Sequence, residues 1–267
     1  MPQNPLPVYW GTPYPDPEKT LSHPWFNGVM ARPLTDFRVL TFDCYGTLID
    51  WETGMWNALQ PLVSGSGLSQ QEALGAFGGY ETRHEMATPD ALYPEVLARV
   101  HHDLADQFGL ETTEELDLAF GASIPNWPAF PDSRDALRQL KERYRLAILS
   151  NVDRASFAAS NRRLGVEFDA VYTAEDIGAY KPDLMNFAYM LERLDQEFGL
   201  GPDDVLHTAQ SLYHDHVPAK ELGLATAWID RQQLSVGGDW GATARVDAPP
   251  TPDYVFFSME EMAAAAD

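Results

Sequence analysis

Short, mainly apolar runs alternate with longer segments of helical periodicity over most of the chain. The runs are four or five residues long, as expected of strands that are buried on both faces of a parallel sheet. They lie at residues 39–42, 145–149, 170–173, 205–209, 225–229 and 254–257. Helical segments lie between them at residues 133–143, 155–164, 183–198 and 217–222, and a Ser258-x-x-Glu261 capping box begins a last helix. This alternation predicts an α/β fold with a Rossmann-like core, that is, a doubly wound parallel sheet.

Residues 52–127 interrupt this alternation with a long stretch of helical periodicity. One helical face there carries Val96, Leu97, Val100, Leu104 and Phe108, and Gly109 is a stop signal. The stretch is far longer than one crossover between neighbouring strands requires, so it predicts an inserted helical cap domain. The core domain then comprises residues 36–51 and 128–267, with a hinge in the Pro-rich segment that joins it to the cap.

The first 35 residues have a different composition from the rest of the chain. They contain eight prolines, together with Trp10, Tyr14, Trp25 and Phe26. Proline at this density blocks both helices and sheet ladders. The aromatic side chains favour packing on the body of the protein or on a second subunit. Residues 1–35 are therefore predicted to form an N-terminal arm, and a homodimer is compatible with it.

The charge balance narrows the range of partners. The chain of 267 residues carries 40 Asp and Glu against 18 Lys and Arg, a formal net charge of −22. Because phosphate groups are bound by clustered Lys and Arg, neither nucleic acid nor an anionic membrane surface is expected as a partner. No apolar run approaches the ~18–20 residues of a transmembrane helix, and no secretory signal pattern is apparent. With a single cysteine, Cys44, these features favour a cytoplasmic protein.

Polar side chains follow the carboxyl ends of four predicted strands. In open α/β sheets, ligands bind at these ends. The side chains are, in chain order, Asp43, Thr47, Ser150, Asn151, Lys181, Gln210, Ser211 and Asp215. Because the carboxyl ends of parallel strands meet at one edge of a sheet, we expect these side chains to converge on one crevice.

Asp43 is the candidate nucleophile. A carboxylate at the end of a buried strand can form an ester intermediate, which divides one difficult displacement into two easier steps; the alternative is an Asp that caps the turn after the strand. Lys181 would neutralise and orient Asp43, unless it is a solvated surface lysine. Thr47 and Ser150 can donate their hydroxyls to an anion, which the helix N-terminus after Asn151 also favours.

Four segments resemble, in order, the four motifs of the haloacid dehalogenase superfamily. They are Phe42-Asp43-Cys44-Tyr45-Gly46-Thr47-Leu48-Ile49-Asp50, Leu149-Ser150-Asn151, Tyr180-Lys181-Pro182-Asp183 and residues 210–219. The resemblance spans residues 38–260 and includes a cap in the same position. It implies that Asp43, Lys181, Asp215 and Ser150 are the catalytic residues, with Asp215 positioning the Lys181 ammonium or the hydrolytic water. Asp215 would alternatively cap a helix.

Two positions separate the classes of this superfamily. Its phosphatases carry a second Asp two residues after the nucleophile as general acid, and an Asp in the fourth motif that binds Mg²⁺; here these positions are Tyr45 and Gln210. Mg²⁺ prefers hard oxygen ligands, usually carboxylates, and a tyrosine with a pKa of ~10 is a poor general acid. The chain instead resembles the (S)-2-haloacid dehalogenases of type II, which act without a metal or another cofactor. No metal site is therefore expected.

The resemblance implies that Asp43 displaces halide from a small 2-haloalkanoic acid and that water then cleaves the ester to give a 2-hydroxy acid. The residues expected around this anionic substrate are Thr47, Tyr45, Asn151, Cys44, Gln210, Ser211, Arg83, Trp51 and His214. Cys44 is expected to be a small buried hydrophobe and not a nucleophile. Two alternatives remain open: a phosphatase of a small phosphorylated metabolite, with a weakened Mg²⁺ site at Gln210 and Asp215, and a non-catalytic interaction protein.

The side of the site that would receive the leaving group departs from the family pattern. Phe187 and Leu212 stand where the dehalogenases carry Tyr and Asn. The dehalogenases bind the halide with an arginine from the cap, and the nearest candidate here is Arg83. Arg83 could equally be a surface residue in helical ion pairs. The nucleophile side thus agrees with the family pattern, and the leaving-group side does not.

Overall fold

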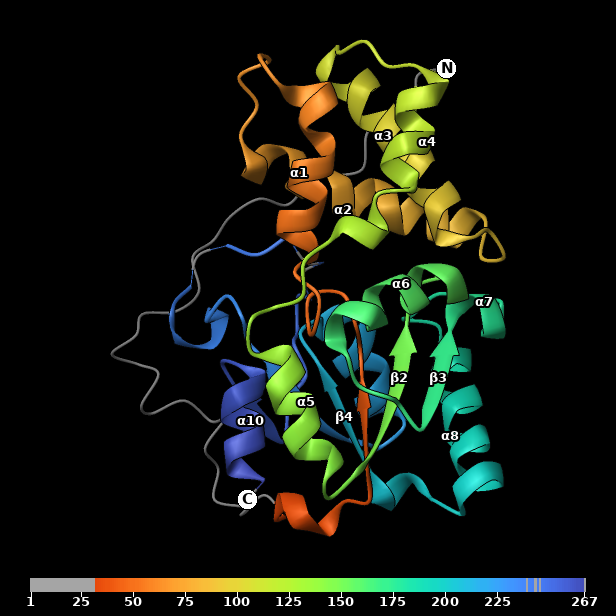
Figure 1. Cartoon of the computed structure of the whole chain (residues 1–267), viewed down its shortest axis with the longest axis vertical. Helices are drawn as coiled ribbons and strands as arrows, with labels where there is room; N and C mark the ends of the chain where they lie inside the picture. Colours follow the sequence, from red (N-terminus) through yellow and green to blue (C-terminus); the bar gives the residue numbers. More distant parts are fainter. Residues whose placement is uncertain (1–31, 239, 243, 245, 267) are drawn as a thin grey trace.

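A six-stranded parallel sheet forms the centre of the molecule in a computed structural model, which describes residues 32–238, 240–242, 244 and 246–266 (Figure 1). The strands are β1 (Val39–Phe42), β2 (Arg145–Ser150), β3 (Ala170–Thr173), β4 (Val205–Ala209), β5 (Ala225–Ile229) and β6 (Tyr254–Phe256). They lie in the order β3-β2-β1-β4-β5-β6, so β1 pairs with both β2 and β4. The predicted N-terminal arm, up to residue 31, lies outside the described residues.

Helices cover both faces of the sheet, because alternate residues of each strand point to opposite sides. Leu146 and Ile148 of β2 share a core cluster with α5 (Ser133–Lys141), α6 (Arg154–Leu164) and α10 (Met259–Ala265). Ala147 and Leu149 share a second cluster with α8 (Leu184–Phe198) and α9 (Val217–Glu221). The predicted Rossmann-like α/β core is thereby confirmed.

The inserted helical cap is also confirmed. Of the five α-helices between β1 and β2 in the sequence, the first four lie together beyond the carboxyl ends of the strands (Figure 1). They are α1 (Trp51–Val63), α2 (Gln70–Ala87), α3 (Tyr93–Phe108) and α4 (Glu114–Gly121). Trp127, in the segment that returns to the core, is buried against Gly54 of α1, where a Cβ would lie 2.4 Å from the indole. This contact ties the cap to the linker and leaves no room for a larger residue at position 54.

One helical turn before α9 differs from the prediction. The sequence pattern begins this helix at residue 217, whereas residues Leu212–His216 already form a π-helical segment, η6. Ser211 caps it, because its Oγ accepts a hydrogen bond from the backbone N–H of His214 at 3.1 Å. The extra turn positions His214 and Asp215 next to the end of β1. The remaining short elements are η3 (Leu34–Asp36), η4 (Ile124–Asn126), α7 (Ala174–Ile177), η5 (Pro202–Asp204) and η7 (Leu234–Val236).

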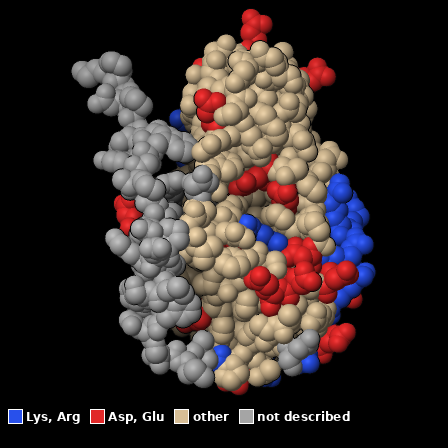
Figure 2. Space-filling view, turned by 90° about the vertical axis from the view of Figure 1, so that its left-hand side faces the viewer, with Lys and Arg blue, Asp and Glu red and all other residues tan. Residues whose placement is uncertain are grey.

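The surface charge is distributed unevenly. On the face shown in Figure 2, Asp and Glu gather in patches, while Lys and Arg form a strip along one edge. Within the described residues, no helix combines the length and the apolar character that a membrane span requires.

Candidate active site

A small cavity lies between the cap and the carboxyl ends of β1, β2 and β4. Its volume is about 70 Å³, enough for about five water-sized groups at roughly 10–15 Å³ each. The predicted site residues that line it are Asp43, Tyr45, Trp51, Ser150, Asn151, Lys181, Gln210, Ser211, His214 and Asp215. The rule that strand ends converge on one crevice therefore holds for this chain.

Asp43 directly follows β1, and its backbone N–H donates to the carbonyl of Thr208 at 3.1 Å, which extends the pairing with β4. The residue is 6% exposed. Its Oδ2 accepts a hydrogen bond from Thr47 Oγ1 at 2.9 Å, and its Oδ1 accepts one from Lys181 Nζ at 2.9 Å. Gly46, with a φ of 95°, makes the turn that brings Thr47 back to Asp43. Both carboxylate oxygens are thus held in place.

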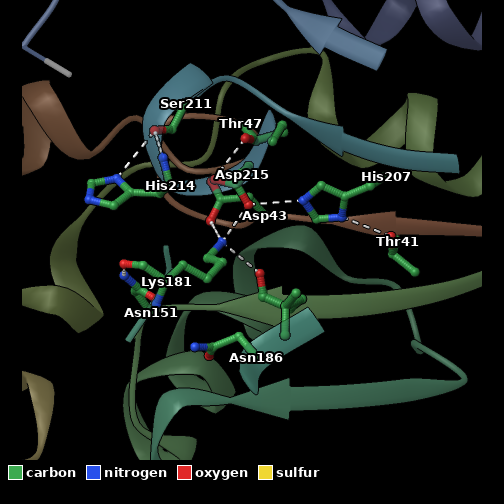
Figure 3. A network of polar contacts seen from close by, with 12 residues as sticks. Thr41, Asp43, Thr47, Asn151, Lys181, Asn186, His207, Ser211, His214 and Asp215 are labelled. Carbon is green, nitrogen blue, oxygen red and sulfur yellow. Dashed lines mark hydrogen bonds and ion pairs between the residues drawn. The ribbon is translucent and has the colours of Figure 1, made fainter. Parts of the chain in front are cut away.

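Lys181 is the centre of a buried polar network (Figure 3). Its ammonium donates to Asp43 Oδ1, to the carbonyl of Leu149 at 2.9 Å and to Asp215 Oδ1 at 2.7 Å. The side chain is 1% exposed. Because an ammonium has three protons, these three acceptors use its full donor capacity and fix its orientation.

Asp215 is held by His207 of β4, which is itself held by Thr41 of β1. Its Oδ1 also lies 2.9 Å from His207 Nε2 on β4, and Nδ1 of the same imidazole lies 2.9 Å from Thr41 Oγ1 on β1. These side chains are buried. The chain Thr41–His207–Asp215–Lys181 therefore connects the sheet interior with Asp43.

Burial and neighbouring charges shift the pKa values of the two carboxylates of the network in opposite directions. Burial raises the pKa of Asp43 above its ordinary value, the charge of Asp215 adds to the effect, and Lys181 opposes it. Burial also acts on Asp215, but Lys181 and His207 outweigh it and lower the pKa of Asp215 well below its usual range. Burial would lower the pKa of Lys181, yet Asp215 and Asp43 outweigh it and raise the pKa. Lys181 is therefore a cation, and Asp43 is the more basic carboxylate.

Ser150 and Asn151 differ in what their side chains offer to a ligand. Ser150 is 2% exposed, and its Oγ has no partner among the described residues. The side chain of Asn151 is already used by the protein: Oδ1 accepts from the Lys181 backbone N–H at 2.7 Å, and Nδ2 donates to the Lys181 carbonyl at 3.0 Å. Ser150 thus has a hydroxyl to donate to a ligand, while Asn151 positions the backbone of Lys181.

The family to which the sequence is similar includes Mg²⁺-dependent enzymes, so the fit of this ion has to be tested. The ammonium of Lys181 lies within hydrogen-bond distance of both Asp43 and Asp215, and it neutralises one of their two charges. The hydroxyl of Tyr45 lies 2.9 Å from Ser160 Oγ, and Gln210 offers only a neutral amide, whose Nε2 donates to Gln232. Both core carboxylates that line the described cavity are thus bound to the ammonium, and Tyr45 and Gln210 add no further carboxylate, so this donor set fits Mg²⁺ poorly.

Three predicted substrate-binding residues do not line the cavity. Thr47 is buried behind Asp43, where its Oγ1 also accepts from the Gln210 backbone N–H at 2.9 Å. Cys44 is completely buried in the core, as the alternation of side chains along a strand requires. Arg83 is directed away from the site: its side chain is 54% exposed, pairs with Asp103 and stacks on Tyr80. The geometry therefore corrects the placement of Cys44 and Arg83 next to the substrate.

The cap instead contributes residues that the sequence analysis did not single out. Glu81 and Glu85 of α2 and Tyr93 of α3 line the cavity. With the buried Phe77, the two glutamates form one stripe at a spacing of four residues, whereas Arg83 lies two residues from each of them, about 200° around the helix. The signal in the sequence was this spacing, which continues the buried face of the helix.

His214 and Gln210 carry further polar atoms at the cavity wall. His214 Nδ1 lies 3.2 Å from Ser211 Oγ, and Nε2 has no partner among the described residues. Burial lowers the pKa of His214 to about 4, against the charge of Asp215, so the imidazole is neutral near pH 7. Gln210 Oε1 is likewise buried without a described partner. These side chains give the wall neutral polar groups next to the Lys181 network.

Comparison with known proteins yields similarities along most of the chain. The family of haloacid dehalogenase-like hydrolases matches residues 37–208. An (S)-2-haloacid dehalogenase of Pseudomonas putida is 25% identical over 84% of this chain and 93% of its own length. The (S)-2-haloacid dehalogenase 4A of Burkholderia cepacia is 30% identical over 73% of this chain and 84% of its own length. A crystal structure of an L-2-haloacid dehalogenase superposes with a TM-score of 0.70 at 25% identity, covering 86% of this chain and 100% of the other.

Proposed function

Because the chain belongs to the family of haloacid dehalogenase-like hydrolases, we propose that it hydrolyses the carbon–halogen bond of small 2-haloalkanoic acids to 2-hydroxy acids, without a metal ion. The observation that carries this proposal is the Lys181 ammonium bound to Asp43 and Asp215 at a site where Tyr45 and Gln210 replace the carboxylates of the phosphatases. Lys181 is the only Lys or Arg among the described residues that line the cavity, so its ammonium is the cation available to Asp43. The similarity to proteins named (S)-2-haloacid dehalogenases supports the same substrate class.

In the first step, a carboxylate oxygen of Asp43 attacks C2 of the substrate. A C–O bond forms, the carbon–halogen bond breaks, and its electron pair leaves with the halide. Asp43 thereby loses its charge and becomes an ester. Lys181 keeps Asp215 as its counter-ion, so no isolated charge remains in the buried site.

In the second step, water adds to the carbonyl carbon of the Asp43 ester. One proton of the water is released, and the acyl C–O bond breaks to give the 2-hydroxy acid and the Asp43 carboxylate. Lys181 stabilises the negative charge that develops on the carbonyl oxygen, and Asp215 holds Lys181 and helps to position the water. The overall reaction consumes one water and releases halide and one proton.

The core side of the cavity suits the carboxylate of such a substrate. Ser150 Oγ has no described partner, and the residues after it lead into α6, whose N-terminus favours negative charge. Tyr45 and Trp51 form part of the wall and limit the size of the substituent on C2. The small volume of the cavity favours acids with few carbon atoms.

The test is halide release in the presence of EDTA. The protein is incubated with fluoro-, chloro- and bromoacetate and with both enantiomers of 2-chloropropionate, and halide is measured by ion chromatography. Release that survives EDTA and disappears in Asp43→Asn, at an unchanged melting temperature, supports the proposal. No halide from any substrate, together with Mg²⁺-dependent release of phosphate from small phosphorylated metabolites, would replace it with the phosphatase alternative.

A further inference from the structure

The cap side of the cavity is acidic. Glu81 and Glu85 reach it from α2, one helical turn apart, and the hydroxyl of Tyr93 on α3 donates a hydrogen bond to Glu81 Oε1. With Asp43 and Asp215, these residues bring four carboxyl groups to one small cavity. Lys181 is the only Lys or Arg among the described residues that line it. An anionic substrate could not enter if all four carboxyl groups were ionised, because one cation would face five negative charges.

The surroundings of the two cap carboxyl groups favour their protonated forms, which reduces this repulsion. Burial and the neighbouring Glu81 raise the pKa of Glu85 well above its ordinary value, against the opposing effects of Lys181 and Asn151. Burial raises the pKa of Glu81 to about 7, although the hydrogen bond from Tyr93 lowers it. A protonated carboxyl group is a hydrogen-bond donor, which an ionised one is not.

The geometry of the displacement places the leaving halogen near these hydrogen-bond donors. In a displacement at C2, the attacking oxygen, the carbon and the leaving halogen lie in line. Asp43 attacks from the core, so the halogen points away from the core and toward the cap. Of the two cap carboxyl groups, Glu85 is 4% exposed, and its one described polar contact is a long 3.5 Å bond from Asn151 Nδ2. Its own proton is therefore available to a ligand.

We propose that Glu85, as a carboxylic acid, donates a hydrogen bond to the halogen as it leaves C2. This inference rests on the proposed dehalogenase function. The electron pair of the carbon–halogen bond goes to the halide, and Glu85 keeps its proton throughout. The dehalogenases bind the halide with a cap arginine, but Arg83 does not line this cavity. The Glu85 carboxylic acid takes over that role here.

The test compares two kinds of substitution at one position. Glu85→Gln keeps a hydrogen-bond donor of nearly the same shape, whereas Glu85→Leu and Glu85→Ala remove it. Glu95→Gln, at an exposed position of α3, is the matched control for the loss of one cap carboxyl group. The turnover number is measured with bromo-, chloro- and fluoroacetate, and the melting temperature of each variant is recorded.

We expect Glu85→Gln to stay within about threefold of the wild type, and Glu85→Leu and Glu85→Ala to lose roughly 10²-fold. The loss should increase from bromide to chloride to fluoride, because a poorer leaving group needs the hydrogen bond more. A loss that is equal for the three halides indicates a structural role and overturns the inference alone, as does an unchanged rate in Glu85→Leu. Absence of halide release by the wild type would overturn the proposed function and this inference together.

Discussion

The ammonium of Lys181 donates to Asp215 Oδ1 over 2.7 Å, and both side chains are 1% exposed. A buried cation without a counter-ion would be costly whenever Asp43 is esterified, because Asp43 then carries no charge. Asp215 removes this cost, since it stays ionised beside Lys181 in every step of the proposed cycle. The pair therefore lets the charge of Asp43 change while the rest of the network stays in place.

Loss of this cation should destabilise the protein. Lys181→Met leaves Asp43 and Asp215 facing each other in a buried site, and removal of one partner from a buried ion pair costs about 3–5 kcal/mol. We expect a drop of this size in the free energy of unfolding, measured by urea denaturation near pH 7, together with loss of activity. The double variant Lys181→Met/Asp215→Asn should lose less than the sum of the single variants, because the residues are in contact. Strictly additive losses would contradict the coupling.

The hydroxyl group of Thr47 is expected to contribute more to stability and activity than the volume of the side chain. It donates to Asp43 Oδ2 and accepts from the backbone N–H of Gln210, so Thr47→Val leaves two buried polar groups without a partner. This should cost about 1–3 kcal/mol of unfolding free energy and raise the pKa of Asp43, which loses a hydrogen bond. Thr47→Ser keeps the hydroxyl and should retain most of the activity. Equal behaviour of the two variants in unfolding and in turnover would argue against this role.

Glu81 makes the stability of the protein depend on pH in a predictable direction. Its pKa is about 7 in the folded state, against an ordinary value of 4.5, so the folded state holds this proton more tightly than the unfolded state. The wild type therefore loses stability from this group as the pH rises from about 4.5 to about 7. Glu81→Gln does not titrate and keeps an acceptor for Tyr93. Its advantage over the wild type should grow between pH 5 and pH 8 to about 1–3 kcal/mol.

Chemical denaturation at several pH values measures this difference. Glu95→Gln removes an exposed carboxyl group from α3. It is the control for the general effect of one fewer negative charge on stability. An advantage of Glu81→Gln that is constant across the pH range would mean that Glu81 is ionised throughout. The cavity would then be more negative than the proposed substrate tolerates.

The core side of the site follows from the sequence, because strand order and alternation leave little freedom there. Asp43 directly follows β1 and Ser150 ends β2, while β4 leads through Ser211 into the turn that carries Asp215. Parallel pairing of these strands brings their carboxyl ends together wherever the chain forms such a sheet. The position of these residues was therefore predictable before any contact was known.

The cap side was not predictable in the same way. Glutamates on a helix are ordinarily surface residues, so the sequence alone predicts that Glu81 and Glu85 are exposed to solvent. Only the packing of α2 on the core, with Phe77 buried on the same stripe, turns them toward Asp43. The spacing of Phe77 and the two glutamates was the local signal for this orientation of α2, whereas Arg83 lies on the opposite side, about 200° around the helix.

Arg83 therefore provides the sharpest check on this orientation of the cap. Its guanidinium pairs with Asp103 and lies 4.7 Å above the ring of Tyr80, on the outer side of α2. Exposed pairs of this kind contribute about 0–1 kcal/mol, so Arg83→Ala should change unfolding free energy by no more than this amount. Halide release, measured as kcat/KM with chloroacetate, should stay within about twofold of the wild type, because no reacting atom is within reach of the side chain. A loss of tenfold or more at unchanged stability would require α2 to rotate when substrate binds, and would restore Arg83 in place of Glu85 as the residue that receives the halide.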